Sequence, residues 1–453
     1  MTPQLTPGLL PMSAFAHSEP TAVGLLDLED PRLRSPTGGN CDGGERDTLV
    51  LVRLHGEPLA AVHLDRDCSE LHGADLLAAL WRDARVAIAA HAQRWDCLWC
   101  PEDPRSFSAQ LARTPDRCGG ERPRRAAASA AVIVCTAGRP IQLERCLRAL
   151  LAQSGAFEVL VVDNRPGDQS SARVVAQLAG ADARLRYVAE PRVGLAVARN
   201  RGVAETDAEI VAFTDDDVVV DAGWLSWLLD AFAEQDVGAA CGLVLPLELQ
   251  TEAQKRFERY DGFCKGLARR SFGPATAQAR GRLLFPYING LVGTGNSMAF
   301  RRAQLIAAGG FDPALGAGSP VGAGEETCAF CAVIQGGRRI VYEPRALCWH
   351  EHRRDLAALT RQVSGYGTSV GAVLTRALMK EPRFYLAAAR APAILFTGGE
   401  EGSPRAGASD MVAPRPRELE RLRLRAMLTG PLRYAQGRRR ARRLGLDGVI
   451  DGR

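Results

Sequence analysis

Four apolar runs decide the fold: AAVIVC (130–135), FEVLVVD (157–163), LRYVAE (185–190) and AEIVAFTDDD (208–217). A segment with helical periodicity follows each run, and strands that alternate with helices form βαβ units around a parallel sheet. The runs are mostly apolar without alternation, as expected for strands that are covered on both faces. The sequence therefore predicts an α/β domain with a mostly parallel sheet, and it shows no repeat of fixed period.

Upstream of these runs the sequence predicts a leader and a small α/β unit. Residues 1–46 are rich in Pro, Gly, Ser and Thr, which is typical of a disordered segment. Residues 47–65 alternate well enough for a hairpin with its turn near His55-Gly56, and residues 73–93 read as a helix. The apolar side of this helix carries Leu76, Leu77, Leu80 and Val86.

We predict four parts in the chain. They are a leader (1–46), a small N-terminal α/β unit with a linker rich in Pro, Arg and Ala (47–126), a catalytic domain (127–356) and a helical, Arg-rich C-terminal region (357–453). A chain of 453 residues is long enough for two or three such units.

Composition excludes several classes of protein. A net charge of +5 is modest for this length and does not favour a nucleic-acid-binding protein. The twelve cysteines are scattered, some within apolar runs, which favours reduced buried thiols over a disulfide framework. No secretory signal and no apolar run of about 18 residues is visible, so we expect a cytoplasmic protein.

The most informative motif is Thr214 followed by the acid triplet, Asp215, Asp216 and Asp217. It comes directly after an apolar strand, and open α/β sheets bind ligands beyond the carboxyl ends of their strands. Three adjacent carboxylates repel one another unless a cation is present, and their hard oxygens suit Mg²⁺ or Mn²⁺. Taken alone, the motif is equally compatible with a solvated acidic turn.

Polar or Gly- and Pro-punctuated loops follow the other three runs as well. They contain Thr136–Pro140, Asp163-Asn164, Glu190–Leu195 and Ala198–Gly202. Four such loops at one edge of a sheet indicate a ligand-binding cleft.

The region of about 130–356 resembles the family 2 glycosyltransferases, which have the GT-A fold. The resemblance covers about half the chain and rests on an ordered set of motifs. These are VIVCTAGRP, VLVVDN, EPRVGLAVARNRG, FTDDD, GTGNSMAFRR with GGFDPALG, GEE and WHEHRRD.

The resemblance implies a nucleotide-sugar donor and a role for each matching residue. Thr136 and Asp163 match positions that line the pocket for the nucleotide base, and Arg199 matches one that approaches the nucleotide. Asp215 resembles the acid near the ribose, and Asp217 resembles the ligand of a divalent cation, Mn²⁺ or Mg²⁺. Asp216 is the variable middle position, which assists.

The resemblance also places donor-sugar or acceptor contacts at Gly295, Asn296 and Glu325. The second acid of the GEE motif, Glu326, resembles the catalytic base that deprotonates an acceptor hydroxyl during an inverting displacement. Relatives usually carry Asp at this position, and many carry another acid where this chain has Cys328. The alternative for Glu325-Glu326 is a structural role, in which two acids stabilise the N-terminus of a helix.

Two histidines, His350 and His352, lie in an H-x-H pattern that puts both rings on one face of a strand. GT-A enzymes often use a downstream His as a further ligand of the cation or diphosphate, and His350 is the better candidate. A structural role for the pair is the alternative. Trp224 lies on an apolar helical stripe, which favours core packing over stacking on a sugar.

The sequence leaves two interpretations open, one for three cysteines and one for the Arg-rich C-terminal segment. Cys97, Cys100 and Cys118 lack an evident fourth zinc ligand, so free thiols are favoured. Residues 412–453 hold twelve arginines and four acids, a local charge of +8. This segment fits a peripheral contact with anionic lipid, at the inner face of the membrane, and equally a solvated basic helix.

We therefore predict an enzyme that transfers a sugar, with inversion and metal assistance, from a nucleotide sugar to an unidentified acceptor, which could be a glycan, a lipid-linked molecule or a small molecule. One rival is a degenerate protein that binds nucleotide sugars without turnover, which Glu326 and Cys328 motivate. The other is a sugar nucleotidyltransferase, which the short TAGRP loop disfavours. Nucleic acid is not an expected partner.

Overall fold

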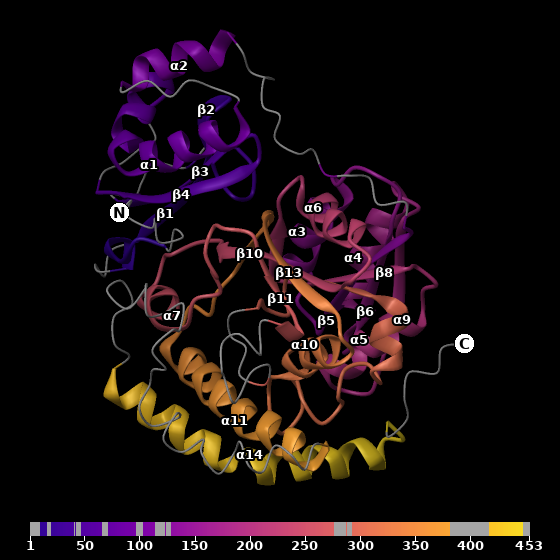
Figure 1. The fold of residues 1–453 in the computed structure, drawn as a ribbon. Coiled ribbons are helices and arrows are strands. Elements are labelled where there is room, and N and C mark those ends of the chain that lie inside the picture. The colour runs from indigo at the N-terminus through magenta and orange to yellow at the C-terminus, as the bar shows by residue number, and fades with distance from the viewer. Residues whose placement is uncertain are drawn as a thin grey trace.

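A computed structural model gives the structure of the chain. It describes residues 10–15, 20–39, 41, 47–65, 71–96, 103–113, 123, 128–275, 287, 292–380 and 416–446. A small N-terminal unit lies beside a larger α/β domain, and two long helices run along the outside of that domain (Figure 1).

The larger domain is built on one mixed sheet, whose strand order is β11-β13-β10-β12-β8-β5-β6-β7, with β9 paired to β13. The strands are β5 (Ala130–Thr136), β6 (Glu158–Asp163), β7 (Leu185–Ala189), β8 (Ile210–Asp215), β9 (Val218–Val220), β10 (Val237–Pro246), β11 (Arg270–Phe272), β12 (Met298–Arg301) and β13 (Arg339–His350). The four predicted strands, β5 to β8, pair with one another in parallel. Strand β12 is antiparallel to both of its neighbours, β8 and β10. The predicted fold class is confirmed.

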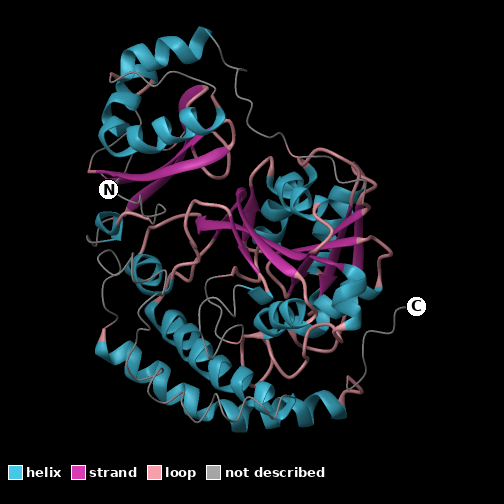
Figure 2. Cartoon of the chain, viewed as in Figure 1, coloured by secondary structure: helices cyan, strands magenta, loops and turns pink. Residues whose placement is uncertain are grey.

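Helices cover both faces of this sheet (Figure 2). They are α3 (Pro140–Leu151), α4 (Ser170–Ala179), α5 (Leu195–Ala204), α6 (Trp224–Asp230), α7 (Glu252–Asp261), α9 (Arg302–Ala307) and α10 (Glu325–Gln335), with the short turns η2 (Pro166–Asp168) and η3 (Ala231–Ala233). One core lies between the sheet and α3, α4 and α6, and another between the sheet and α5, α9 and α10. Trp224 is fully buried in the first core, as predicted.

The N-terminal unit is a four-stranded sheet of order β2-β1-β3-β4. Its elements are η1 (Met12–Phe15), β1 (Thr21–Asp27), β2 (Asp30–Arg34), β3 (Asp47–Leu54), β4 (Glu57–Leu64), α1 (Gly73–Trp95) and α2 (Pro104–Arg113). The predicted hairpin is confirmed as β3 and β4, and His55 and Gly56 at its turn have positive φ, as a type I′ turn requires. The predicted helix corresponds to α1. Val86, which we expected on its packed apolar side, is exposed.

The prediction of a disordered leader over residues 1–46 is wrong for its middle part. Residues 21–34 form β1 and β2, and β1 pairs in parallel with β3 across seven residue pairs. The run TAVGLLD in β1 is nearly all buried, because this strand is interior to the sheet. Pairing with a strand that comes later in the chain supplies the stability that the surrounding Pro- and Gly-rich sequence lacks.

The N-terminal sheet packs against the larger domain through one face. Val50 and Val52 of β3 point to α1, whereas Leu49 and Leu51 belong to a core that continues into the larger domain. At the boundary, Arg53 pairs with Asp221 at 2.8 Å. The two units therefore share buried surface.

Two long helices, α11 (Leu356–Lys380) and α14 (Arg417–Arg443), lie side by side at the edge of the larger domain (Figure 1). Their contact is close because glycines face each other: a Cβ on Gly371 would lie 2.1 Å from the carbonyl oxygen of Met427, and Gly430 is in equally tight contact with Gly371. Within the described residues, no helix is long and apolar enough to span a membrane.

This contact makes a testable prediction for α11. Gly371→Ala should reduce the free energy of unfolding by about 2–3 kcal/mol, because the new methyl group would overlap backbone that cannot rotate away. Gly365→Ala, on the same helix but with nothing near its Cβ position, should be neutral or stabilise by up to about 1 kcal/mol. Urea unfolding and trypsin cleavage within the Arg-rich α14 would measure both effects. Equal behaviour of the two variants would contradict the close packing.

Candidate active site

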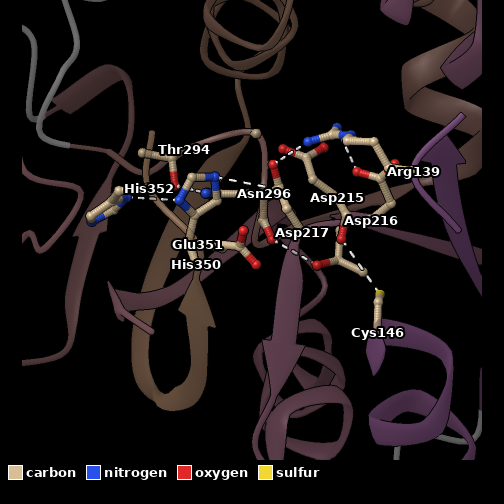
Figure 3. A network of polar contacts seen from close by, with 12 residues as sticks. Arg139, Cys146, Asp215, Asp216, Asp217, Thr294, Asn296, His350, Glu351 and His352 are labelled. Carbon is tan, nitrogen blue, oxygen red and sulfur yellow. Dashed lines mark hydrogen bonds and ion pairs between the residues drawn. The ribbon is translucent and has the colours of Figure 1, made fainter. Parts of the chain in front are cut away.

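The acid triplet lies where β8 ends and the chain turns into β9 (Figure 3). Because β9 pairs antiparallel with the end of β13, Val218 lies opposite His350. This register brings the Nε2 atom of His350 to 3.4 Å from the Oδ1 atom of Asp217. The structure thus brings together Asp217 and His350, which the sequence analysis named as ligands of one cation.

Asp216 and Asp217 are buried and pair with Arg139, whereas the Asp215 side chain is 26% exposed. The Arg139 guanidinium lies 2.5 Å from Asp216 Oδ1 and 2.5 Å from Asp217 Oδ2. Burial raises the pKa of Asp216 to about 7, although Arg139 opposes the shift. Burial also disfavours the charge on Asp217, but neighbouring groups, Arg139 among them, leave its pKa below the usual value.

Sequence analysis did not assign a role to Arg139. The only signal was its place at the end of the first strand, in the loop TAGRP. Its side chain reaches across the sheet edge from the start of α3 to carboxylates 78 residues away. No local pattern predicts such a contact.

Arg199 lies at the centre of a second buried ion cluster. Its guanidinium donates to Glu325 Oε1 at 2.7 Å, to Asp215 Oδ1 at 3.2 Å and to the carbonyl oxygen of Gly295 at 3.0 Å. The side chains of Arg199 and Glu325 are 2% and 3% exposed. Both side chains are thus enclosed by protein, and the expected roles of Arg199 near a nucleotide and of Glu325 near a sugar or acceptor stay predictions.

The enclosed Glu325 leads to a prediction about pH. Burial and the nearby Glu326 raise the pKa of Glu325 from 4.5 to about 8, against the attraction of Arg199. Between these two values the folded chain keeps a proton that the unfolded chain has released, so the free energy of unfolding falls as the pH rises. In EDTA, the wild type should lose roughly 2–4 kcal/mol more than Glu325→Gln between pH 5 and pH 8.

Urea unfolding of both proteins across this pH range would check the difference. Glu144→Gln is a control, because Glu144 is an exposed residue that pairs with Arg148 on α3. If the wild type and Glu325→Gln gave parallel pH profiles, the raised pKa of Glu325 would be ruled out.

The two residues expected near the nucleotide base end β5 and β6. Thr136 donates its hydroxyl to Asp216 Oδ2 at 2.7 Å, which ties the first strand to the acid triplet. Asp163 is fully buried and accepts hydrogen bonds from the Arg165 amide and the Tyr187 hydroxyl, both at 2.9 Å. Burial and the bond to Asp163 raise the pKa of Tyr187 to about 12, so this tyrosine stays protonated.

The Gly295-Asn296 turn packs directly against the end of β8. The Thr214 hydroxyl donates to the carbonyl oxygen of Asn296 at 3.0 Å, and Thr294 donates to the Asn296 side chain (Figure 3). A Cβ on Gly295 would lie 3.0 Å from Arg199, so this glycine serves close packing around the ion cluster.

Glu326 is the second residue of helix α10 and is partly exposed, unlike the first residue, Glu325. Among the residues that the structure describes, its carboxylate has one weak hydrogen bond, 3.5 Å from the Thr327 hydroxyl. Cys328, two residues further on, is buried, and burial raises the pKa of its thiol to about 12. Of the two acids, Glu326 is therefore the one that remains accessible to a bound molecule.

The loop of residues 316–324 before Glu326 is held by the C-terminal helix. Arg440 of α14 donates to the carbonyl oxygens of Gly318 at 3.0 Å and Val193 at 2.5 Å. Tyr434 of the same helix donates to Asp312 at 2.9 Å, just before the loop. Helix α14 is thus part of the framework of the site, a role that its basic composition did not indicate.

The cysteines fall into two groups. Cys135, Cys146 and Cys241 are buried free thiols, as predicted. Cys97, Cys100 and Cys118 lie outside the described residues.

Comparisons with known proteins match part of the chain to one family model. Residues 131–303 match the family model described as "Glycosyl transferase family 2". The "Pre-mycofactocin glycosyltransferase" of Mycobacterium tuberculosis is 29% identical over 232 residues, which are 51% of this chain and 45% of that protein. The chain therefore spans less than half the length of this curated relative.

Two other similarities are more limited. The "Putative inactive polypeptide N-acetylgalactosaminyltransferase 12" of Drosophila melanogaster is 39% identical over 106 residues, 23% of this chain and 18% of that protein. Among solved structures, the mannosyltransferase PcManGT from Pyrobaculum calidifontis, determined with GDP-Man and Mn²⁺, has a TM-score of 0.45 and 19% identity, covering 69% of this chain and 91% of that one.

Proposed function

We propose that this chain, whose residues 131–303 match the model of glycosyl transferase family 2, transfers a sugar from a nucleotide sugar to an acceptor hydroxyl group with inversion and metal assistance. The observation that carries the proposal is the meeting of Asp217 and His350 at the carboxyl edge of the sheet, 3.4 Å apart. Ligands of α/β proteins bind at this edge.

The donor set at this point fits a divalent cation. Asp217 Oδ1 is buried and makes no hydrogen bond in the described part of the chain, and it faces the Nε2 atom of His350. The described residues contain no group of three His, Cys, Asp or Glu side chains that would enclose a metal by themselves. This suits a cation that shares its ligands with a donor diphosphate.

Asp217 and His350 would hold the cation, with Asp216 in support. When bound, the cation supplies positive charge that stabilises the departing nucleoside diphosphate. Thr136 and Arg139 fix the carboxylates through the contacts described above. Thr136 and Asp163, at the ends of adjacent strands, are the side chains proposed to border the nucleotide base, and Asn296 the sugar.

Glu326 is proposed as the general base. It would take the proton of the acceptor hydroxyl while the acceptor oxygen bonds to the anomeric carbon and the bond from that carbon to the diphosphate oxygen breaks. Its partial exposure at the start of α10 leaves its carboxylate open to an acceptor. Attack opposite the leaving group inverts the anomeric centre.

A donor screen tests the function. Purified protein is given UDP-, GDP- and dTDP-sugars with Mn²⁺, with Mg²⁺ or with EDTA, and hydrolysis and transfer are followed over a broad acceptor panel. Metal-dependent turnover supports the proposal and identifies the donor. Metal-dependent nucleotide binding without turnover would instead establish the degenerate binding protein, and absence of any nucleotide binding would refute both.

We also propose that α14 contacts the anionic inner face of a membrane from the cytoplasmic side. Its outer surface exposes Leu428 and Leu432, at 78% and 64%, next to the exposed Arg421 and Arg425. Apolar side chains flanked by arginines suit the boundary of an anionic bilayer. The full chain should sediment with phosphatidylserine vesicles but not with phosphatidylcholine vesicles, and the double variant L428S/L432S should not sediment with either. Equal sedimentation of wild type and variant would refute the contact.

A further inference from the structure

A buried row of polar side chains leads from Asp217 away from the acid triplet to helix α7. His350 Nδ1 lies 2.8 Å from His352 Nδ1, and His352 Nε2 lies 2.5 Å from Glu258 Oε1. The side chains of His352 and Glu258 are each 1% exposed. We call His350, His352 and Glu258 the histidine row; Figure 3 shows its two histidines beside Asp217.

For an ionised Glu258 and two neutral rings, the contacts within the histidine row determine where the protons lie. An ionised Glu258 can only accept, so His352 carries a proton on Nε2. A neutral His352 then has a bare Nδ1, which accepts the hydrogen bond from Nδ1 of His350. His350 is left with a lone pair on Nε2, the atom that faces Asp217.

This order of protons decides what His350 can do. A lone pair on Nε2 can bind a cation, whereas the opposite tautomer would direct an N–H group at Asp217 and could only donate to it. In metalloproteins, the partner on the second ring nitrogen sets the tautomer and the orientation of a ligating histidine.

Aromatic packing keeps the rings of the row in place. Phe263 meets His350 edge-on with 5.1 Å between ring centroids, and Phe257 lies 4.6 Å from His352. Both phenylalanines come from α7 or the residues just after it, as does Glu258. The same short segment thus supplies both the acceptor and the packing for the row.

We propose that Glu258 and His352 are positioning residues that direct the proton of His350 to Nδ1, so that its Nε2 atom binds the divalent cation together with Asp217. The proposal rests on the proposed function, because it concerns the cation of that same site. It adds Glu258, which no motif identified, and it gives a role to His352, which the H-x-H pattern contained. Glu258 lies 94 residues before His352 in the sequence.

The tautomer can be observed without any variant. The chain has seven histidines, so a two-bond ¹H–¹⁵N spectrum of the labelled, metal-free protein is simple enough to assign, with His350→Asn identifying the signal of His350. The expected result is His350 protonated on Nδ1 with a bare Nε2. A proton on Nε2 of His350 would overturn the proposal.

Binding of Mn²⁺ alone, followed by the electron paramagnetic resonance of the free ion, tests the consequence. Glu258→Gln provides an acceptor without charge and should weaken Mn²⁺ binding about tenfold, with the His350 signal shifted toward the other tautomer. Glu248→Gln is the matched control, since Glu248 bonds to Gln254 and Arg354 outside the row. It should keep the affinity of the wild type.

The outcomes separate this inference from the proposed function. If the wild type binds Mn²⁺ and Glu258→Gln binds it equally well, the histidine row has only a structural role and the inference fails alone. If the wild type binds no Mn²⁺, both metal assistance and the inference fail. Should Glu258→Gln fold poorly, the tautomer measured in the wild type still decides.

Discussion

Asp217→Asn should reduce kcat/KM for transfer at least about 1000-fold and abolish measurable Mn²⁺ binding. The substitution keeps the shape of the side chain but removes the charge from the oxygen that faces His350. Loss of one strong electrostatic contact to the leaving group typically costs two to three powers of ten in rate. Loss of the cation that this residue would hold adds to that effect.

Steady-state kinetics with the donor found in the screen, and Mn²⁺ titration of the same samples, would measure both changes. Asp207→Asn is the matched control, because it makes the same change of charge on a fully exposed side chain of the same domain. Turnover by Asp217→Asn above about a tenth of the wild-type rate would show that Asp217 does not hold the cation.

Glu326→Gln should lower kcat by about 10²–10⁴ and leave the affinity for the donor nearly unchanged. The change removes the group proposed to take the acceptor proton, and such a group typically contributes a factor of this size. The acid triplet, which would hold the donor diphosphate, is not touched. A fall in kcat without a rise in KM for the donor is therefore the expected signature.

Two further variants test whether Glu326, and not Glu325, is the general base. Glu326→Asp keeps a carboxylate on a shorter side chain and should retain more activity than Glu326→Gln. Glu325→Gln tests the neighbouring acid, which is enclosed with Arg199 rather than open to an acceptor. If Glu325→Gln lost activity while Glu326→Gln kept it, the two glutamates would have been assigned the wrong way round.

The strands of the larger domain could be predicted because each is a run of consecutive apolar residues. β5 and β6 are apolar from end to end, since helices cover both faces of the sheet. β1 was missed because its seven residues lie between Pro- and Gly-rich segments. Its pairing with β3 is a contact between separate parts of the chain, which local composition does not contain.

Some residues of the candidate site could likewise be predicted from local sequence, and others could not. The acid triplet and His350 follow strands directly, so their meeting at one sheet edge could be expected. Arg139 and Glu258 act through contacts across 78 and 94 residues, and neither belongs to a motif that predicts its partner. Arg199 was recognised in its motif, but its enclosure between Glu325 and Asp215 depends on how three loops pack.

The hydrogen bond from Arg440 to the loop before Glu326, the proposed general base, has a consequence for the order of synthesis. Arg440 leaves the ribosome 122 residues after Gly318, whose carbonyl group it binds. At about 5–20 residues per second, roughly 6–24 s pass between them. During that time a nascent chain has its acid triplet and both glutamates but lacks the helix that holds the loop. Translation itself therefore delays the moment at which the proposed active site becomes complete.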